Sequence, residues 1–225
     1  MDGTRIVLVR HGESRAQERG ILGGHDSCTG LSERGRRQVE ALRDRLLASG
    51  ELAGSDHLYA SLLPRAIETA EIIAPAVGGH EIVRECAFCE GHPGEADGMT
   101  FAELAELPGG AEWTADLKPL PGWETWSEMG ERVAASLASL VERHPGETVV
   151  VACHGGVIVH AMLGYLGLDD SATAQRAWFA AINSSITEFR FGPNPYRKGT
   201  LPVELVRYND HAHLAGTDLL VEGVL

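Results

Sequence analysis

Arginine and histidine side chains stand directly after an aliphatic run near the start of the chain. The stretch IVLVRHGES, residues 6–14, ends four apolar residues with Arg10 and His11. A second run, VVVACHGG, ends in the same way at His154 and Gly155. A buried strand gains nothing from such an ending, because polar groups that are buried without partners lose their hydration. These endings therefore indicate a functional site.

Polar residues also follow two other apolar runs. Ser61 and Arg65 come after HLYA, and Glu90 comes shortly after EIVR. If these runs are parallel strands, their carboxyl ends meet at the sheet edge where open α/β sheets bind ligands. We therefore expect two arginines, two histidines and one carboxylate to converge there: Arg10, Arg65, His11, His154 and Glu90.

Phosphoryl transfer is the chemistry that this set favours. Arginine binds phosphate oxygens through paired hydrogen bonds, a neutral imidazole can attack phosphorus, and a carboxylic acid can protonate a leaving oxygen. Gly12 would let the backbone approach an oxyanion, and a helix after Gly155 and Gly156 would offer amide donors. Each residue alone has an ordinary structural explanation, such as a solvated Arg65 on a helix face. Their joint placement at strand ends favours the functional interpretation.

Apolar runs that alternate with helical patterns must position this set. They predict a three-layer, doubly wound α/β fold, with a mostly parallel six-stranded sheet and helices on both faces. The expected strands are residues 5–9, 57–60, 81–84, 148–152, 186–191 and 203–207, the first four of them parallel. The expected helices are residues 32–47, 64–74 before Pro75, 125 to about 144, and 155 to about 163.

We expect one domain over residues 1–225. Residues 91–124 are rich in Gly, Pro and Trp and lack strand alternation, which predicts an irregular, lid-like excursion. One short helix is expected in it, because Thr100 and Glu103 have the spacing of a capping box. From about Asn209 the chain is expected to form a loosely attached tail, although its stretch NDHAHL could dock on the body.

The formal net charge of -13 argues against nucleic acid as a partner, because phosphate backbones are bound by clustered Lys and Arg. An anionic substrate must then be held locally. An arginine about 4 Å from a phosphate oxygen gains roughly 4 kcal/mol per unit charge at an effective dielectric near 20. The four apolar residues near the amino terminus are too few for a signal peptide or a membrane span, so we expect a cytoplasmic protein without a membrane partner.

The four cysteines, Cys28, Cys86, Cys89 and Cys153, are too sparse for a disulfide framework. Cys86 and Cys89 have CxxC spacing, but a zinc site would need a second such pair, which the sequence lacks. We expect structural or incidental thiols, with metal or redox use as the alternative. Three tryptophans could line a pocket for a large leaving group or fasten the excursion to the core: Trp113, Trp123 and Trp126.

The chain resembles the histidine phosphatase superfamily, in the branch that contains cofactor-dependent phosphoglycerate mutases and their phosphatase relatives. The resemblance rests on four motifs in order: LVRHGES, YASLLPRAIETAEII, EGHPGEADGMT and VVVACHGGVI. It implies that His11 is the nucleophile and forms a phosphohistidine. It implies that Glu90 protonates the leaving oxygen and then acts as the base for water. The phosphoryl group would be held by Arg10, Arg65, His154 and Gly155.

The resemblance also bears on substrate and cofactors. It implies substrate contacts at Ser14, Gln17, Thr29 and Gly30, no cofactor and no metal, and relatives that are often dimers. Mutases usually carry Trp-Asn where this chain has Ala16-Gln17, and extra arginines where residues 91–124 offer only Lys118. The resemblance therefore implies a phosphomonoester hydrolase acting on a small phosphorylated metabolite. Mutase-type transfer and a phosphate-binding protein without catalysis are the alternatives.

Overall fold

One sheet organises the computed structural model, which describes residues 3–107, 114–168, 179–193 and 203–220. Within those residues its order is β3-β2-β4-β1-β5-β6. Strands β1, β2, β3 and β4 are parallel to one another, whereas β5 pairs antiparallel with both β1 and β6. The bounds are β1 Thr4–Arg10, β2 His57–Ala60, β3 Ile82–Arg84, β4 Thr148–Cys153, β5 Ile186–Phe191 and β6 Val203–Asp210. The predicted α/β fold with four parallel strands is confirmed.

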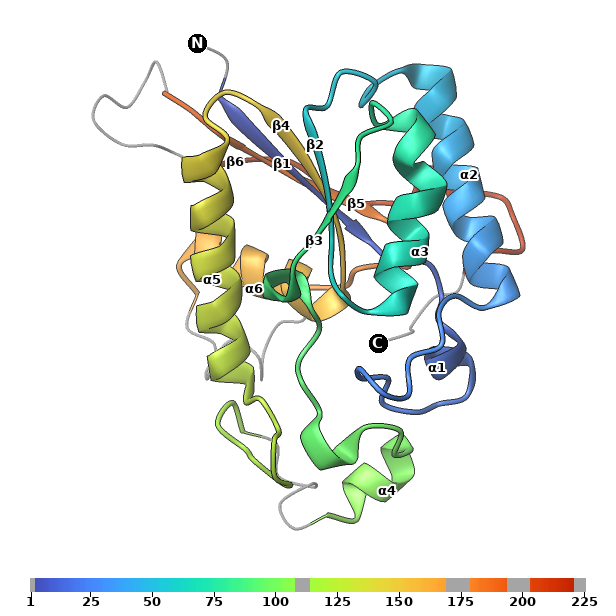
Figure 1. Cartoon of the computed structure of the whole chain (residues 1–225), viewed down its shortest axis with the longest axis vertical. Helices are drawn as coiled ribbons and strands as arrows, with labels where there is room; N and C mark the ends of the chain where they lie inside the picture. The colour runs from blue at the N-terminus through green and yellow to red at the C-terminus, as the bar shows by residue number, and fades with distance from the viewer. Residues whose placement is uncertain (1–2, 108–113, 169–178, 194–202, 221–225) are drawn as a thin grey trace.

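Helices cover both faces of the sheet (Figure 1). The α-helices are α1 Arg15–Glu18, α2 Glu33–Ser49, α3 Pro64–Ile73, α4 Phe101–Ala105, α5 Trp126–Arg143 and α6 Gly155–Leu166. Four short 3-10 helices are η1 Ala74–Ala76, η2 Cys86–Phe88, η3 Gly94–Ala96 and η4 Ala212–Leu214 in the described part of the chain. Helices α2 and α3 lie on one face, and α5 and α6 lie on the other.

The alternation of side chains along β1 divides the core into two layers. Ile6 and Leu8 pack in the cluster that includes the apolar faces of α5 and α6. Val7 and Val9 pack in the cluster with α2 and α3. Successive strand residues point to opposite faces, so a strand covered on both sides reads as one continuous aliphatic run. This is why β1 could be recognised from sequence.

Local signals set the helix boundaries. Ser32 caps α2 through a hydrogen bond from the Gly35 amide to its Oγ of 3.0 Å, and Gly50 ends that helix at φ 66°. Helix α4 begins with the predicted capping box, and α5 begins with a second one, formed by Thr125 and Glu128. Pro75 does not end the third helix abruptly, because the chain continues as the 3-10 turn η1.

The predictions for the irregular excursion and for the tail have different outcomes. The excursion carries α4 as expected, together with η3, and Trp113 lies outside the described residues. The prediction of a loosely attached tail is wrong as far as residue 220, and its alternative, that NDHAHL docks on the body, is confirmed. Leu214 and Leu219 are buried, and the Gln38 side chain donates to the Leu219 carbonyl at 2.9 Å. These leucines fasten the tail to α2 by the same burial that packs the core.

No helix among the described residues is long and apolar enough to cross a membrane.

Candidate active site

The predicted site residues meet at the carboxyl edge of the parallel strands. His11 follows β1, His154 follows β4, and Arg65 stands in the first turn of α3 after β2. The segments that carry α1 and α4 lie beyond this edge (Figure 1). A cavity of about 500 Å³ opens there, and its wall includes Arg10, His11, Arg65, Glu90, Gly155 and Gly156. The structure therefore brings together the groups that the sequence placed at successive strand ends.

Hydrogen bonds at both ring nitrogens fix the state of His11. Nδ1 lies 2.6 Å from the carbonyl oxygen of Gly12, and Nε2 lies 3.1 Å from Nε of Arg65. A carbonyl can only accept and a guanidinium can only donate, so Nδ1 carries the proton and Nε2 keeps its lone pair. Burial lowers the pKa of His11 well below its usual value, with further lowering by Arg65 and Arg10. His11 is therefore a neutral base with its free nitrogen at the arginine.

His154, beside His11, is held as the other neutral tautomer, with its proton on Nε2. Its Nδ1 accepts from Nε of Arg65 at 3.3 Å, and its Nε2 lies 2.6 Å from Oγ of Ser61. Ser61 Oγ also accepts from the Leu63 amide at 3.2 Å. Burial lowers the pKa of His154 well below its usual value, and Arg65 adds to the effect. The two imidazoles, with ring centroids 5.1 Å apart, thus share one arginine N–H.

Arg10 and Arg65 are both only 5% exposed, and neither forms an ion pair with a carboxylate of the described residues. Arg65 donates through Nη1 to the Gly23 carbonyl at 2.8 Å, and Arg10 donates to the Ala181 carbonyl. Burial, together with the charge of Arg65, lowers the pKa of Arg10 to about 10, although the charge of Glu90 acts in the opposite direction. Arg10 stays cationic at neutral pH, so two positive charges face the cavity, and their hydrogen-bond partners among the described residues are neutral.

Glu90 is bound by backbone amides. Its Oε2 accepts from the Gly156 amide at 3.2 Å, and its Oε1 accepts from the Gly91 amide at 3.3 Å. Gly156 belongs to the first turn of α6, where amide groups have no partner within the helix. A Cβ at Gly156 would lie 2.1 Å from Oε1 of Glu90. Glycine is therefore required there for the close approach of the carboxylate.

Two glycines serve purposes other than those expected. The Gly156 amide, predicted as a donor to an oxyanion, donates to Glu90. Gly12, predicted to let the backbone approach an oxyanion, donates its amide to Thr69 Oγ1 at 3.3 Å. A Cβ at Gly12 would lie 2.3 Å from the Gly35 carbonyl oxygen, so this glycine allows β1 and α2 to pack closely.

The predicted substrate contacts separate into two pairs. Ser14 and Gln17 line the cavity, where they form the capping box of α1. Thr29 and Gly30 are not part of the cavity wall. The Thr29 carbonyl accepts from Arg15 at 3.0 Å, and Gly30 lies against the carboxylate of Glu68. The loop that carries them turns away because Glu68 binds the amide of the next residue, Leu31, at 2.8 Å.

Asn183 is a site residue that the sequence analysis missed. Its Nδ2 donates to the carbonyl of His11 at 3.0 Å and lies 3.3 Å from Oε1 of Gln17. It therefore supports both the histidine and the cavity wall. A usable signal was present: Asn183 comes just before β5, and β5 is antiparallel to β1, so the start of β5 lies beside the end of β1.

Apolar side chains cover much of the remaining wall of the cavity. They are Ile21, Leu22, Phe101, Trp126, Val159 and Phe179. The ring of Trp126 packs on His160 with centroids 4.0 Å apart. Trp123 instead pairs through its backbone with Pro93. Trp126 therefore lines the cavity, as the first interpretation expected, whereas the bridge at Trp123 joins two parts of the excursion and does not fasten it to the core.

Comparisons with known proteins agree with this geometry. The model of the histidine phosphatase superfamily (branch 1) matches residues 6–200. The chain is 30% identical over 228 residues to phosphoglycerate mutase-like protein 4 of Arabidopsis thaliana, which covers 99% of this chain and 92% of that protein. It is 32% identical over 186 residues to a metal-independent phosphoserine phosphatase of Arabidopsis thaliana, covering 80% and 75% respectively.

Solved structures give the same match. The crystal structure of phosphoserine phosphatase from Entamoeba histolytica in complex with 3-phosphoglyceric acid superimposes with a TM-score of 0.74 at 26% identity. The match covers 94% of this chain and 99% of that one.

Proposed function

The chain belongs to the histidine phosphatase superfamily (branch 1), and we propose that it hydrolyses phosphomonoesters of small metabolites through a phosphohistidine at His11. One observation carries the proposal. The unprotonated Nε2 of buried, neutral His11 faces the cavity beside Arg65, which has no carboxylate partner in the described chain. A nucleophile and an uncompensated cation are thus presented together to an incoming phosphate.

In the first step, Nε2 of His11 attacks phosphorus and the bond from phosphorus to the ester oxygen breaks. Before this attack, the hydrogen bond that Nε–H of Arg65 donates to the imidazole must shift to a phosphate oxygen, while the proton stays on Arg65; the shift frees the lone pair that attacks. Arg10 and Arg65 stabilise the charge on the phosphoryl oxygens, as preorganised donors do in other transfer reactions. The hydrogen bond from Nδ1–H to the Gly12 carbonyl stabilises the positive charge that the ring acquires.

Glu90 moves the protons in both steps. In its acid form it donates a proton to the leaving oxygen, and the alcohol departs. The carboxylate then takes a proton from the water that attacks the phosphohistidine. The bond from Nε2 to phosphorus breaks, inorganic phosphate leaves and His11 returns to its neutral state. The amides of Gly91 and Gly156 keep the carboxylate in place for both transfers.

The charges of the cavity favour hydrolysis over mutase-type transfer. Among its described lining residues, the permanently cationic ones are Arg10 and Arg65, and much of the rest is apolar. A mutase must hold a carboxylate and two phosphates, and each additional buried anion needs its own cation or donor. Mutase-type transfer is the alternative, tested by incubating the enzyme with 3-phosphoglycerate and 2,3-bisphosphoglycerate. Accumulation of 2-phosphoglycerate faster than inorganic phosphate would favour the mutase.

The substrate class follows from the wall of the cavity. Apolar side chains together with Ser14 and Gln17 suit a leaving group that has a carbon skeleton and one or two polar groups. The named relatives, a phosphoserine phosphatase and a neighbour that binds 3-phosphoglyceric acid, suggest where to begin.

The direct test is phosphate release from a panel of phosphomonoesters. The panel contains phosphoserine, 3-phosphoglycerate, sugar phosphates, a nucleoside monophosphate and an aryl phosphate. We expect release from at least one of them, at a rate that added Mg²⁺ or brief exposure to a chelator leaves unchanged. Inorganic phosphate bound without turnover of any ester would instead support the phosphate-binding alternative. Activity lost in chelator and restored by Mg²⁺ would contradict the mechanism.

A further inference from the structure

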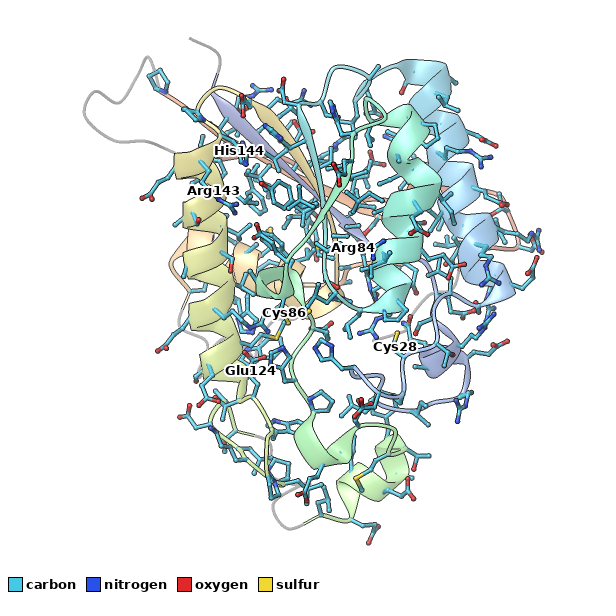
Figure 2. All side chains as sticks on the ribbon, in the orientation of Figure 1. Cys28, Arg84, Cys86, Glu124, Arg143 and His144 are labelled. Atoms are coloured by element: carbon cyan, nitrogen blue, oxygen red, sulfur yellow. The ribbon has the colours of Figure 1, made fainter. Side chains whose placement is uncertain are left out.

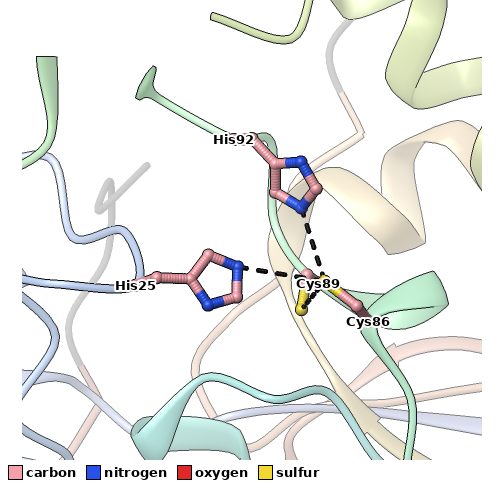
Figure 3. Close-up of side chains that lie close together, drawn as sticks. All are labelled: His25, Cys86, Cys89 and His92. Carbon is pink, nitrogen blue, oxygen red and sulfur yellow. Dashed lines mark hydrogen bonds between the residues drawn. The ribbon is translucent and has the colours of Figure 1, made fainter. Parts of the chain in front are cut away.

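Four side chains that the proposed reaction does not use gather just outside the cavity: His25, Cys86, Cys89 and His92. Their sulfur and ring nitrogen atoms all lie within 4.8 Å of one another. Figure 3 shows both imidazoles directed at the sulfur atoms. The Cys86 sulfur lies 3.8 Å from Nε2 of His25, 3.5 Å from Nε2 of His92 and 3.0 Å from the Cys89 sulfur.

These distances are close to those of a tetrahedral zinc site. With Zn–S bonds of about 2.3 Å and Zn–N bonds of about 2.0 Å, tetrahedral angles place the ligand atoms roughly 3.3 to 3.8 Å apart. The two distances from the Cys86 sulfur to the ring nitrogens already fall in this range. The two free thiols must separate by less than about 1 Å to reach the same geometry.

We propose that His25, Cys86, Cys89 and His92 bind one Zn²⁺ as a closed, four-coordinate structural site. Two thiolates and two imidazoles are a ligand set that selects zinc over the oxygen-seeking cations. All four positions are occupied by protein, which leaves no place for substrate or for an activated water. The sequence lacks a second CxxC pair, and two histidines from different segments supply the missing ligands.

Interactions of Arg132 hold the two cysteines ready for the metal. Its Nη1 donates to the carbonyls of Cys86, Ala87 and Cys89 at 3.4, 3.0 and 3.0 Å. Its other nitrogens bind Glu124 at 2.7 Å. Figure 2 shows Cys86 and Glu124 beside the lower end of α5. The 3-10 turn η2 is therefore fixed before any cation arrives, and ligands fixed in advance bind more tightly.

Charge and proton balance are both satisfied. Two thiolates and two neutral imidazoles neutralise Zn²⁺, and the nearby Arg132 cation favours the thiolate form. A thiol must lose its proton before it can bind the metal, so binding must release protons to solvent, and the apparent affinity must fall as the pH is lowered.

The position of the cluster indicates that a bound cation would connect two segments of the active site. Cys89 and His92 flank Glu90 and Gly91, which line the cavity. His25 lies two residues after Gly23, the carbonyl of which accepts a hydrogen bond from Arg65. A zinc ion would thus join the segment that carries the acid to the segment that positions the arginine. It would act by positioning, without contact with substrate.

Metal loading of the full-length protein tests the proposal without any activity measurement. The reduced protein is stripped with a strong chelator and titrated with Zn²⁺ or Co²⁺. We expect one metal per chain, the visible absorption of tetrahedral cobalt with a thiolate-to-cobalt charge-transfer band, and a melting temperature that rises with zinc concentration. These readouts do not depend on His11, so they stand or fall separately from the phosphatase proposal.

Matched variants identify the ligands. His25→Ala and His92→Ala should each weaken zinc binding by at least about 100-fold, and Cys86→Ser with Cys89→Ser should abolish the charge-transfer band. Cys28→Ala is the control, because Cys28 packs against Cys86 and Cys89 but is not one of the four ligands. It should bind zinc like the parent. Loading that needs Cys28, or that survives removal of both histidines, would overturn the proposed ligand set.

Two further outcomes would overturn the site itself. The first is a reduced, folded protein that takes up no zinc. The second is a Cys86–Cys89 disulfide that persists under conditions in which cytosolic thiols are reduced, because an oxidised pair cannot supply two thiolates. Since all variants are compared by melting temperature without metal, a variant that merely fails to fold is recognised before it is titrated.

Discussion

The arginines at the carboxyl edge of the sheet and those that join α2 to β5 and β6 are partnered in opposite ways. At the carboxyl edge, Arg10 and Arg65 are 5% exposed and donate to carbonyls and imidazoles. In the second region, Arg207 bonds to Glu188 at 3.0 Å and to Glu51 at 2.6 Å. The same network includes Arg5, Arg45 and Asp210.

The difference separates charge held for binding from charge held for stability. A buried cation without a counter-ion is costly, and an incoming anion repays that cost. A cation already paired with carboxylates has little affinity left for a further anion and instead holds its elements together. The first region should therefore govern activity, and the second should govern the free energy of unfolding.

Arg65→Ala should produce the largest effect. It removes a phosphate ligand and the shared donor of both imidazoles, so we expect kcat/KM to fall by at least about 1,000-fold. The melting temperature should stay the same or rise, because an uncompensated buried charge is removed. Steady-state kinetics and calorimetry on the same preparation check both. A variant that keeps its activity would remove the distinction between the two regions.

Gly156→Ala tests the position of Glu90, the cavity carboxylate that the Gly91 and Gly156 amides hold. The added methyl group would meet Oε1 of Glu90, so the acid must move and kcat should fall by roughly 10 to 100-fold. Gly164→Ala is the matched control in the same helix, because a Cβ at Gly164 meets no atom within 4 Å. It should leave kcat unchanged and stabilise α6 slightly. Equal kinetics for the two variants would show that the placement of Glu90 is unimportant.

Arg207→Met should lower stability and leave activity nearly unchanged, the opposite of the effect expected for Arg65→Ala. It leaves the carboxylate of Glu188, only 2% exposed, with Arg5 as its remaining cation. Because a partly buried ion pair is broken, the free energy of unfolding should fall by roughly 2 to 4 kcal/mol. Urea denaturation measures the loss, and kcat/KM measured well below the melting temperature should remain within about twofold. A stable but inactive Arg207→Met would contradict the comparison.

The pH dependence of stability should differ between the regions. The pKa values of His11 and His154 are lowered, so below about pH 6.5 the unfolded chain binds protons that the folded chain refuses. Their contribution to the free energy of unfolding is therefore constant above that pH and becomes destabilising as the pH falls. The Asp210 pKa is lowered chiefly by Arg45, so its stabilisation is lost only below the ordinary value of 3.8.

Urea titrations at pH 8, 6 and 5 measure this difference. His11→Ala should reduce the slope of unfolding free energy below about pH 6 by up to about 1.4 kcal/mol per pH unit, which corresponds to one proton. Asp210→Asn should leave that slope unchanged over the same range. An unaltered slope in His11→Ala would mean that His11 is protonated in the folded protein, which would also remove the proposed nucleophile.

Sequence patterns were sufficient to place the site residues at strand ends, but they could not place the residues on its loops. Arg10, His11, Arg65 and His154 could be placed because strand ends of a parallel sheet meet at one edge whatever the loops do. Thr29 and His25 could not be placed, because the path of their loop depends on contacts such as that between Glu68 and the Leu31 amide.

The same reason explains the other omissions. The meeting of His25 with Cys86 joins residues 61 positions apart through irregular segments, and no periodicity describes it. The sequence left the docking of NDHAHL undecided, because Leu214 is a single apolar residue in a polar stretch. Its burial depends on contacts with α2, which a local pattern does not contain.

Trapping the covalent intermediate tests the central claim most directly. The enzyme is mixed briefly with a radiolabelled phosphomonoester that it hydrolyses, then denatured and digested. The account predicts label on the peptide that contains His11, lost in acid and stable in base, and no label on His11→Ala. Turnover without any trapped label on the wild type, or label that persists on His11→Ala, would contradict it.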